Sequence, residues 1–202
     1  MKSFQNYKKM TNSPVEKLPF PPFLPNKAKW LFLGSFPPKK QRWSMDFFYP
    51  NFQNDMWRIF GLIFFENKNQ FVNTNEKRFE KDAILAFLTK QHIAVYDTAA
   101  TVIRHKDNAS DKDLEIVEAV DIGKLVRNLT DLQAIVTTGE KATNTVIRHF
   151  AEKSIHIAPP AVGTYTTFVF ENRTLRLYRM PSSSRAYPLS LEKKAEIYRK
   201  VF

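Results

Sequence analysis

The stretch KWLFLGSF, residues 29–36, decides the fold of this chain. Four consecutive apolar residues, 30–33, are followed by Gly34, and a short apolar run that ends in a turn residue is typical of a buried strand in a parallel sheet. Such a strand has helices on both faces and similar strands beside it. The stretch therefore predicts an α/β fold if the rest of the chain supplies those elements.

Further strands and helices alternate along the chain. Apolar, β-rich runs predict strands at IAVYDTAA (93–100) and LQAIVTTG (132–139), and TFVFENRTLRLYRM (167–180) predicts a hairpin turning at 171–173. Apolar residues at helical spacing predict helices at NDMWRIFGLIFF (54–65), EKRFEKDAILAFLTKQH (76–92), EKATNTVIRHFAEK (140–153) and SLEKKAEIYRKVF (190–202). Ser190 has the side chain of an N-cap and should begin the last of these helices.

This order of elements predicts one α/β domain, residues 29–202, built as a three-layer sandwich around a central, mostly parallel sheet of about four strands. Residues 1–28 are basic and proline-rich and predict an extended N-terminal arm. Ligands of such sheets bind beyond the carboxyl ends of the strands. The loops after Gly34, Val95, Val136 and Met180 are therefore the candidate site.

The charge and the composition restrict the class of partner. The chain has 31 Lys and Arg against 20 Asp and Glu, a net charge of +11. This surplus favours a polyanion, either nucleic acid or an acidic membrane surface. There is no cysteine, which excludes disulfides and thiolate metal sites. No apolar run has the length of a signal peptide or a membrane span, so we expect a cytoplasmic, soluble monomer.

Several catalytic signatures are absent from the sequence. It contains no GxxxxGK[ST] phosphate loop, no GxGxxG, no GxSxG and no HExxH. Their absence argues against nucleotide hydrolysis, nicotinamide chemistry and serine esterase activity. The four histidines, at 92, 105, 149 and 156, lack the spacing of metal ligands, so we predict no metal.

The loop GSFPPKKQRWSMDFFYPNFQNDMW, residues 34–57, is the most informative connection. One glycine, two early prolines and a group of aromatic rings suit a rigid backbone cradle whose rings stack on a flat ligand. With 18 phenylalanines in the chain, packing in the core is an equal alternative for Phe47, Phe48 and Tyr49.

Five short motifs in a fixed order carry a resemblance to a known family. They are GSFP (34–37), NDMWRI (54–59), VYDTAA (95–100), VTTGEKA (136–142) and MPSSS (180–184). This set resembles the uracil-DNA glycosylase superfamily, and within it most nearly the hypoxanthine-DNA glycosylase branch, then the mismatch-specific uracil-DNA glycosylases. The resemblance covers residues 29–202.

The resemblance implies a DNA glycosylase of base-excision repair. Such an enzyme flips a damaged or mismatched base out of DNA and cleaves its bond to the deoxyribose. The implied enzyme is monofunctional, needs no cofactor and acts on a deaminated base, hypoxanthine or uracil. A non-catalytic nucleic-acid-binding module that kept the pocket is the alternative, and a small-molecule nucleoside hydrolase is a third.

The resemblance also assigns roles to residues of the pocket. Asn54 would be catalytic, holding the water or the base, although an asparagine at this place is also a good helix N-cap. Many relatives carry an aspartate or asparagine at the position of Phe36, whereas the hypoxanthine branch has an apolar residue there, as this chain does. Asp97 would accept N–H groups of the base, and Thr138 replaces an asparagine of the hypoxanthine branch. The implied substrate-binding residues are Gly34, Ser35, Phe36, Pro37, Phe48, Asp97 and Thr138.

The serine-rich loop near the C-terminus would contact DNA. Met180 replaces a histidine of many relatives and cannot stabilise charge on the departing base, which argues for weak activity on uracil. The implied DNA-binding residues are Pro181, Ser182, Ser183, Ser184, Arg185 and Tyr187 of this loop, with Lys39, Lys40 and Arg42 facing phosphates. A plain solvated turn is the alternative for the loop.

Overall fold

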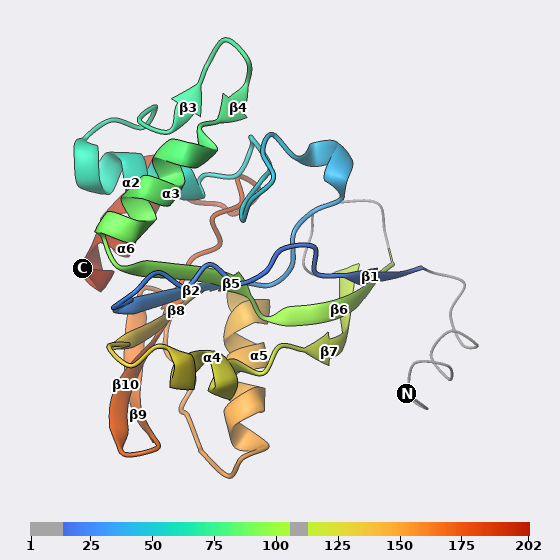
Figure 1. Cartoon of the computed structure of the whole chain (residues 1–202), viewed down its shortest axis with the longest axis vertical. Coiled ribbons are helices and arrows are strands. Elements are labelled where there is room, and N and C mark those ends of the chain that lie inside the picture. The colour runs from blue at the N-terminus through green and yellow to red at the C-terminus, as the bar shows by residue number, and fades with distance from the viewer. Residues whose placement is uncertain (1–13, 106–112) are drawn as a thin grey trace.

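A computed structural model describes residues 14–105 and 113–202 of the chain. Its centre is a five-stranded sheet in the order β5-β2-β8-β10-β9 (Figure 1). These strands are β2 (Trp30–Gly34), β5 (Ile93–Asp97), β8 (Ala134–Thr138), β9 (Thr164–Phe170) and β10 (Arg173–Met180). The sequence predicted about four strands; the sheet has five because β9, the first arm of the predicted hairpin, joins it as an edge strand.

The sheet is mostly parallel, as predicted. β5, β2, β8 and β10 run in one direction, and β9 runs antiparallel to β10. Glu171 and Asn172 connect β9 to β10, and both have positive φ, of 48° and 66°. Two consecutive residues of that kind give the tight hairpin turn that matches the strand twist, so the turn lies within the predicted 171–173.

Helices cover both faces of the sheet. On one side lie α2 (Met56–Phe65), α3 (Lys81–Lys90) and α6 (Leu191–Tyr198), and on the other α4 (Ile122–Asn128) and α5 (Glu140–Ala151) (Figure 1). Four of these helices fall within the predicted ranges, and Ser190 caps α6 by accepting the N–H of Lys193 at 3.2 Å. The sequence pattern did not indicate α4.

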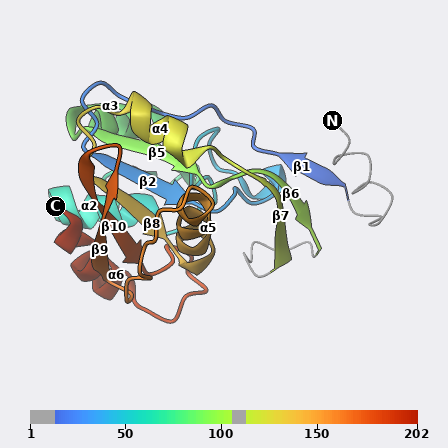
Figure 2. The ribbon, with the colours of Figure 1, turned by 90° about the horizontal axis from the view of Figure 1, so that it is seen from below.

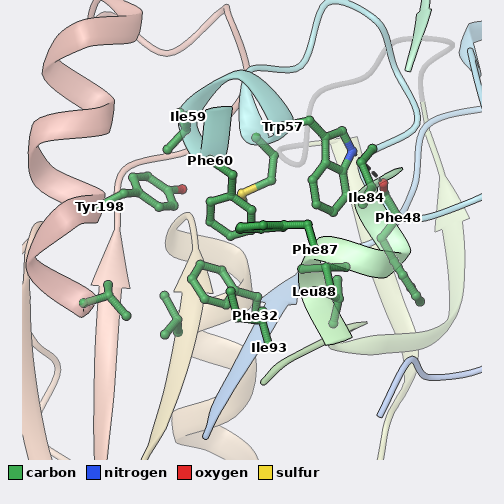
Figure 3. Close-up of a cluster of buried hydrophobic side chains, with 14 of the residues drawn as sticks. Phe32, Phe48, Trp57, Ile59, Phe60, Ile84, Phe87, Leu88, Ile93 and Tyr198 are labelled. Atoms are coloured by element: carbon green, nitrogen blue, oxygen red, sulfur yellow. Dashed lines mark hydrogen bonds between the residues drawn. The ribbon is translucent and has the colours of Figure 1, made fainter. Parts of the chain in front are cut away.

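The face beneath α2, α3 and α6 is packed with aromatic rings (Figure 3). Phe32 of β2 meets Phe60 of α2 edge to face at 5.2 Å between ring centroids, and Phe60 lies 5.6 Å from Phe87 of α3. Trp57 is fully buried beside them. Alternate residues of β2 point to the opposite face, where Leu31 and Leu33 pack in a mainly aliphatic cluster under α4 and α5.

A second, three-stranded sheet extends from the domain in the order β1-β6-β7 (Figure 2). It is formed by β1 (Val15–Lys17), β6 (Ala99–Arg104) and β7 (Leu114–Ala119). The predicted strand 93–100 is thus two strands, because the chain leaves the central sheet at Thr98. Residues 14–28 of the predicted arm are mostly extended and lie on the domain, with β1 paired to β6 and Ala28 buried, whereas residues 1–13 lie outside the described part of the chain.

The predicted helix 76–92 begins later than expected. Arg78–Phe79 forms the short strand β4, paired to β3 (Val72–Asn73), and the helix starts at Lys81. Lys77 has a φ of 51°, which a helix does not allow, and Phe79 is buried in the aromatic core from the strand. Phe79 satisfied the helical spacing, but its side chain reaches the core from a different backbone conformation.

Candidate active site at the carboxyl edge of the sheet

The four parallel strands end together at one edge of the sheet. Gly34 of β2 lies opposite Asp97 of β5, and Met180 of β10 lies opposite Thr138 of β8. A cavity of about 1350 Å³ opens at this edge and is lined by residues that end or follow all four strands. The loop at the first glycine and the serine-rich loop, 146 residues further along, therefore face the same cavity.

Most of the pocket residues predicted from sequence line this cavity. From the cradle and the strand ends they are Gly34, Ser35, Phe36, Pro37, Asn54, Asp97 and Thr138, and from the C-terminal loop Pro181, Ser182, Ser183, Ser184 and Tyr187. Phe48 is not among the lining residues. It is buried below the cavity and packs against Phe20, Phe47 and Tyr96.

Tyr49 takes the place at the cavity that the sequence analysis gave to Phe48. Its φ of 49° is rare for a residue with a side chain, and it turns Tyr49 toward the cavity while Phe47 and Phe48 enter the core. The Tyr49 hydroxyl lies 3.1 Å from Oγ1 of Thr138, and its ring packs edge to face on Trp57. The run FFY predicts a group of rings, but which ring faces outward depends on this single backbone angle.

Gly34 brings Asp97 against the backbone of the cradle. A Cβ at position 34 would lie 2.3 Å from Oδ1 of Asp97 and 3.4 Å from the Tyr49 hydroxyl. No side chain fits there, so the buried carboxyl group of Asp97 packs directly on the main chain where β2 becomes a loop. The glycine is required by this close approach and not by a positive φ.

Asn54 precedes Asp55, the N-cap residue of α2, and lines the cavity. Its Oδ1 accepts the backbone N–H of Met56 at 2.9 Å, at the start of α2. Among the described residues, no hydrogen bond of its amide nitrogen is found, so the NH₂ group is available to a ligand as a donor. Arg58 fixes the same segment by donating to the carbonyl oxygens of Asn54 at 3.1 Å and Phe52 at 2.8 Å.

The serine-rich loop is held by both α2 and α6. The N–H of Asp55 donates to the carbonyl oxygen of Ser183 at 2.9 Å, and Tyr198 donates its hydroxyl to the carbonyl oxygen of Pro181 at 2.7 Å. Burial raises the pKa of Tyr198 well above its ordinary value, so this hydroxyl stays a donor. Arg185 is not among the lining residues and donates to Oδ1 of Asp55 at 3.0 Å.

The basic residues at the cavity differ from those predicted. Lys39, Lys40 and Arg42 are absent from its lining, and Lys40–Arg42 forms an exposed 3-10 turn beside it. The lining cations are instead Arg104, Lys141, Arg148 and Arg179. Lys141 and Arg148 are seven residues apart on α5, a helical spacing that places them on one face and that the sequence could have indicated.

Arg104 and Lys141 also join the cavity to the second sheet. Arg104 is paired with Glu16 at 3.0 Å and donates to the carbonyl oxygen of Pro37 at 3.0 Å, so it joins β1 to the cradle. Lys141 donates to the carbonyl oxygen of Leu114 at 2.5 Å, from α5 to the second sheet. The second sheet thus forms part of the cavity wall.

Neither a metal site nor a membrane span is found in the described part of the chain. No three His, Asp or Glu side chains there are grouped as metal ligands. None of the helices described there has both the length and the apolar character needed to cross a bilayer.

Comparison with solved structures finds the same fold in a protein from Methanosarcina acetivorans that is provisionally described as a uracil DNA glycosylase. Its solution NMR structure matches with a TM-score of 0.57 and 20% identity, over 93% of this chain and 99% of that chain. At this identity the likeness establishes the fold alone. No family model matches the chain, and no curated protein matches it.

Proposed function

We propose that this protein is a monofunctional DNA glycosylase of the uracil-DNA glycosylase superfamily, which hydrolyses the N-glycosidic bond of a deaminated base, hypoxanthine or uracil, in DNA. The observation that carries the proposal is the convergence of all five motif segments on one cavity. The fold shared with the Methanosarcina acetivorans protein supports it. The net charge of +11 suits a polyanionic substrate, and no cofactor is required.

In the proposed reaction, water attacks the anomeric carbon while negative charge grows on the departing base. Asn54 donates its amide N–H groups to the water or to the base from the edge of the cavity. The first turn of α5, which follows Gly139 directly, presents the positive end of a helix to the same space and favours an anionic leaving group. Asp97 accepts N–H groups of the base, such as N1–H of hypoxanthine.

Two apolar residues restrict the rate and the substrate. Phe36 and Met180 are both buried at the cavity edge, where they supply neither a proton acceptor nor a cation. The enzyme therefore relies on Asn54 and on backbone donors, and we propose a purine lesion over uracil. Lys141 also lines the cavity, but its amino group is held on the carbonyl of Leu114, and we propose no lyase step.

Alkali cleavage of lesion-containing duplexes tests the proposal. The protein is incubated with duplexes that hold a single hypoxanthine or uracil, and strand scission after alkali reports an abasic site. Asn54→Ala is expected to lower the single-turnover rate about 100- to 1000-fold, the cost typical of removing one transition-state donor.

Asn144→Ala is the matched control, because this exposed asparagine lines the same cavity from α5 and has no proposed catalytic role. Salt-sensitive binding of the duplexes with no scission at either lesion contradicts the enzyme and supports a non-catalytic nucleic-acid-binding module.

A further inference from the structure

A buried lysine joins three segments of the chain behind the cavity. Lys194 of α6 has no exposed surface, and its Nζ lies 3.0 Å from Oδ2 of Asp55 and 2.7 Å from the carbonyl oxygen of Ser184. Asp55 precedes the first residue of α2, and Ser184 lies in the serine-rich loop. One ammonium group therefore ties α6 to both the start of α2 and the loop.

Stability alone is a poor explanation for such a lysine. Burial of an ammonium group and a carboxylate carries a desolvation penalty that often equals or exceeds their attraction, and a buried apolar pair is frequently as stable. A lysine can donate hydrogen bonds to two segments at once, which an apolar residue cannot do. Its N–H groups point in separate directions and bind a side chain and a backbone carbonyl from different segments.

The segments that Lys194 joins carry two walls of the cavity. Asp55 directly follows Asn54, which pairs with Ser184 in an isolated antiparallel bridge. The N–H of Asp55 also donates to the carbonyl oxygen of Ser183. The separation between Asn54 and the serine-rich loop thus depends on contacts made by Asp55 and Lys194.

We propose that Lys194 is a positioning residue, which acts through Asp55 and Ser184 to fix the serine-rich loop relative to Asn54. This inference rests on the proposed function, in which Asn54 and the loop act on the same nucleotide. A loop free to shift away from α2 would widen the cavity between the two walls. Misplacement of reacting groups by about 1 Å can cost about 100-fold in rate.

Arg185 is the second and outer partner of Asp55. Its side chain is 49% exposed, whereas the Lys194 side chain is fully buried. Because Lys194 already balances the charge of Asp55, Arg185 can leave the carboxylate for a DNA phosphate without leaving a buried charge unpaired. The clamp, defined as Lys194 with Asp55 and Ser184, therefore does not require Arg185.

The test compares Lys194→Met, Asp55→Asn and the double variant D55N/K194M with the wild type. Lys194→Met leaves the buried Asp55 with only the exposed Arg185, and Asp55→Asn leaves a buried ammonium group without a counter-charge, so each single variant is expected to lose stability. The double variant removes both charges and is expected to regain most of its melting temperature. Lys193→Met is the matched control, because Lys193 is the exposed neighbour of Lys194 on α6 and pairs only with Glu196 among the described residues.

Two readouts separate positioning from simple stability. Amide hydrogen exchange of residues 182–187 in the free protein is expected to quicken about tenfold in the double variant, with exchange in the central sheet unchanged. The single-turnover rate on the preferred lesion is expected to stay at least about tenfold below the wild type in the same variant. Lys193→Met should match the wild type in both.

Wild-type exchange of the loop in the double variant, or recovery of the full rate together with the melting temperature, overturns the inference. The exchange measurement needs no activity. If the wild type releases no base from any duplex, the proposed function fails, and loop exchange still shows whether Lys194 holds the loop.

Discussion

The inner end and the outer rim of the cavity are built differently. The inner end, formed by Gly34, Tyr49, Asp97 and Thr138, is closely packed, with polar groups that contact one another and little room to move. The outer rim, formed by Asn144 and Arg148 on α5, is exposed to solvent. Both belong to one cavity.

This difference separates two tasks of the proposed enzyme. A closely packed polar end discriminates by shape and by hydrogen bonds, so small displacements there change the rate strongly. An exposed charged rim acts through phosphate contacts, which contribute to affinity, depend on salt and carry little sequence information. Substitutions at the inner end should therefore affect chemistry, and those at the rim should affect binding.

At the inner end, the largest effect is expected from Gly34→Ala. The added Cβ would lie 2.3 Å from Oδ1 of Asp97, so the buried carboxyl group must rotate away. We expect a stability loss of about 1 to 3 kcal/mol from overpacking and a fall of about 100-fold in the single-turnover rate. Thermal unfolding and alkali cleavage measure the two quantities.

Gly61→Ala is the control, because it introduces an overpacked Cβ at a position away from the cavity. Its Cβ would lie 2.4 Å from the carbonyl oxygen of Asn67 at the far end of α2. It should lose at least as much stability, because the clash is with backbone that cannot rotate away, and it should keep the rate of the wild type once folded. Equal rates in the two variants would show that the packing of Asp97 on Gly34 does not matter for chemistry.

Tyr49→Phe should have a smaller effect at the same end of the cavity. It removes the hydroxyl that lies 3.1 Å from Thr138 and leaves the ring on Trp57. One lost hydrogen bond is worth about 1 kcal/mol, so we expect up to about a tenfold lower rate. Tyr165→Phe, which changes an exposed tyrosine of β9, is the control and should leave the rate unchanged.

At the rim, Arg148→Ala should weaken binding and leave the chemical step intact. The slope of log affinity against log salt should fall by about 1 if Arg148 contacts one phosphate, with a similar loss for duplexes with and without a lesion. Fluorescence anisotropy at several salt concentrations measures this slope. Arg127→Ala is the control, because Arg127 is an exposed residue of α4 that pairs with Glu171. A slower rate at saturating protein in Arg148→Ala would show that the rim also contributes to the chemical step.

The sequence predicted the inner end of the cavity better than its surroundings. Apolar runs mark parallel strands, and the carboxyl ends of such strands must meet, so Gly34, Asp97 and Thr138 could be brought together without a structure. The orientation of Tyr49 depends on one unusual backbone angle. A local pattern does not specify such an angle.

Long-range packing explains the other differences. The second sheet pairs β6 with β1, about 85 residues earlier in the chain. Neither short segment has a sequence pattern that specifies which strand it pairs with. Lys193 and Lys194 are adjacent and chemically identical, yet one is exposed and the other is fully buried. Only the position of α2 against α6 decides which of them meets Asp55.

The smallest effect is expected for the pH dependence of stability, through His149. This residue is next to the rim in sequence, but its side chain is buried in the core. His149 follows Arg148 on α5, and its Nε2 accepts the backbone N–H of Gly123 at 3.0 Å, which requires a neutral ring. Burial, with a smaller contribution from Lys153, lowers the pKa of His149 below its ordinary 6.5. The approach of Nε2 to Asp121 at 3.4 Å would be an ion pair only for a protonated ring, and burial opposes that state.

Because folding favours the neutral ring, the contribution of His149 to stability is complete above its unfolded pKa. It is lost as the pH falls below that value, where the unfolded chain takes up the proton first. The melting temperature should therefore fall between about pH 7.5 and about pH 5.5, and His149→Gln, whose amide can still accept from Gly123, should reduce this fall. Salt-dependent DNA binding of His149→Gln at the higher pH should equal that of the wild type, since the ring faces away from the rim. An unchanged pH dependence in His149→Gln would show that folding does not lower the pKa of His149, and would contradict a buried neutral ring held by the N–H of Gly123.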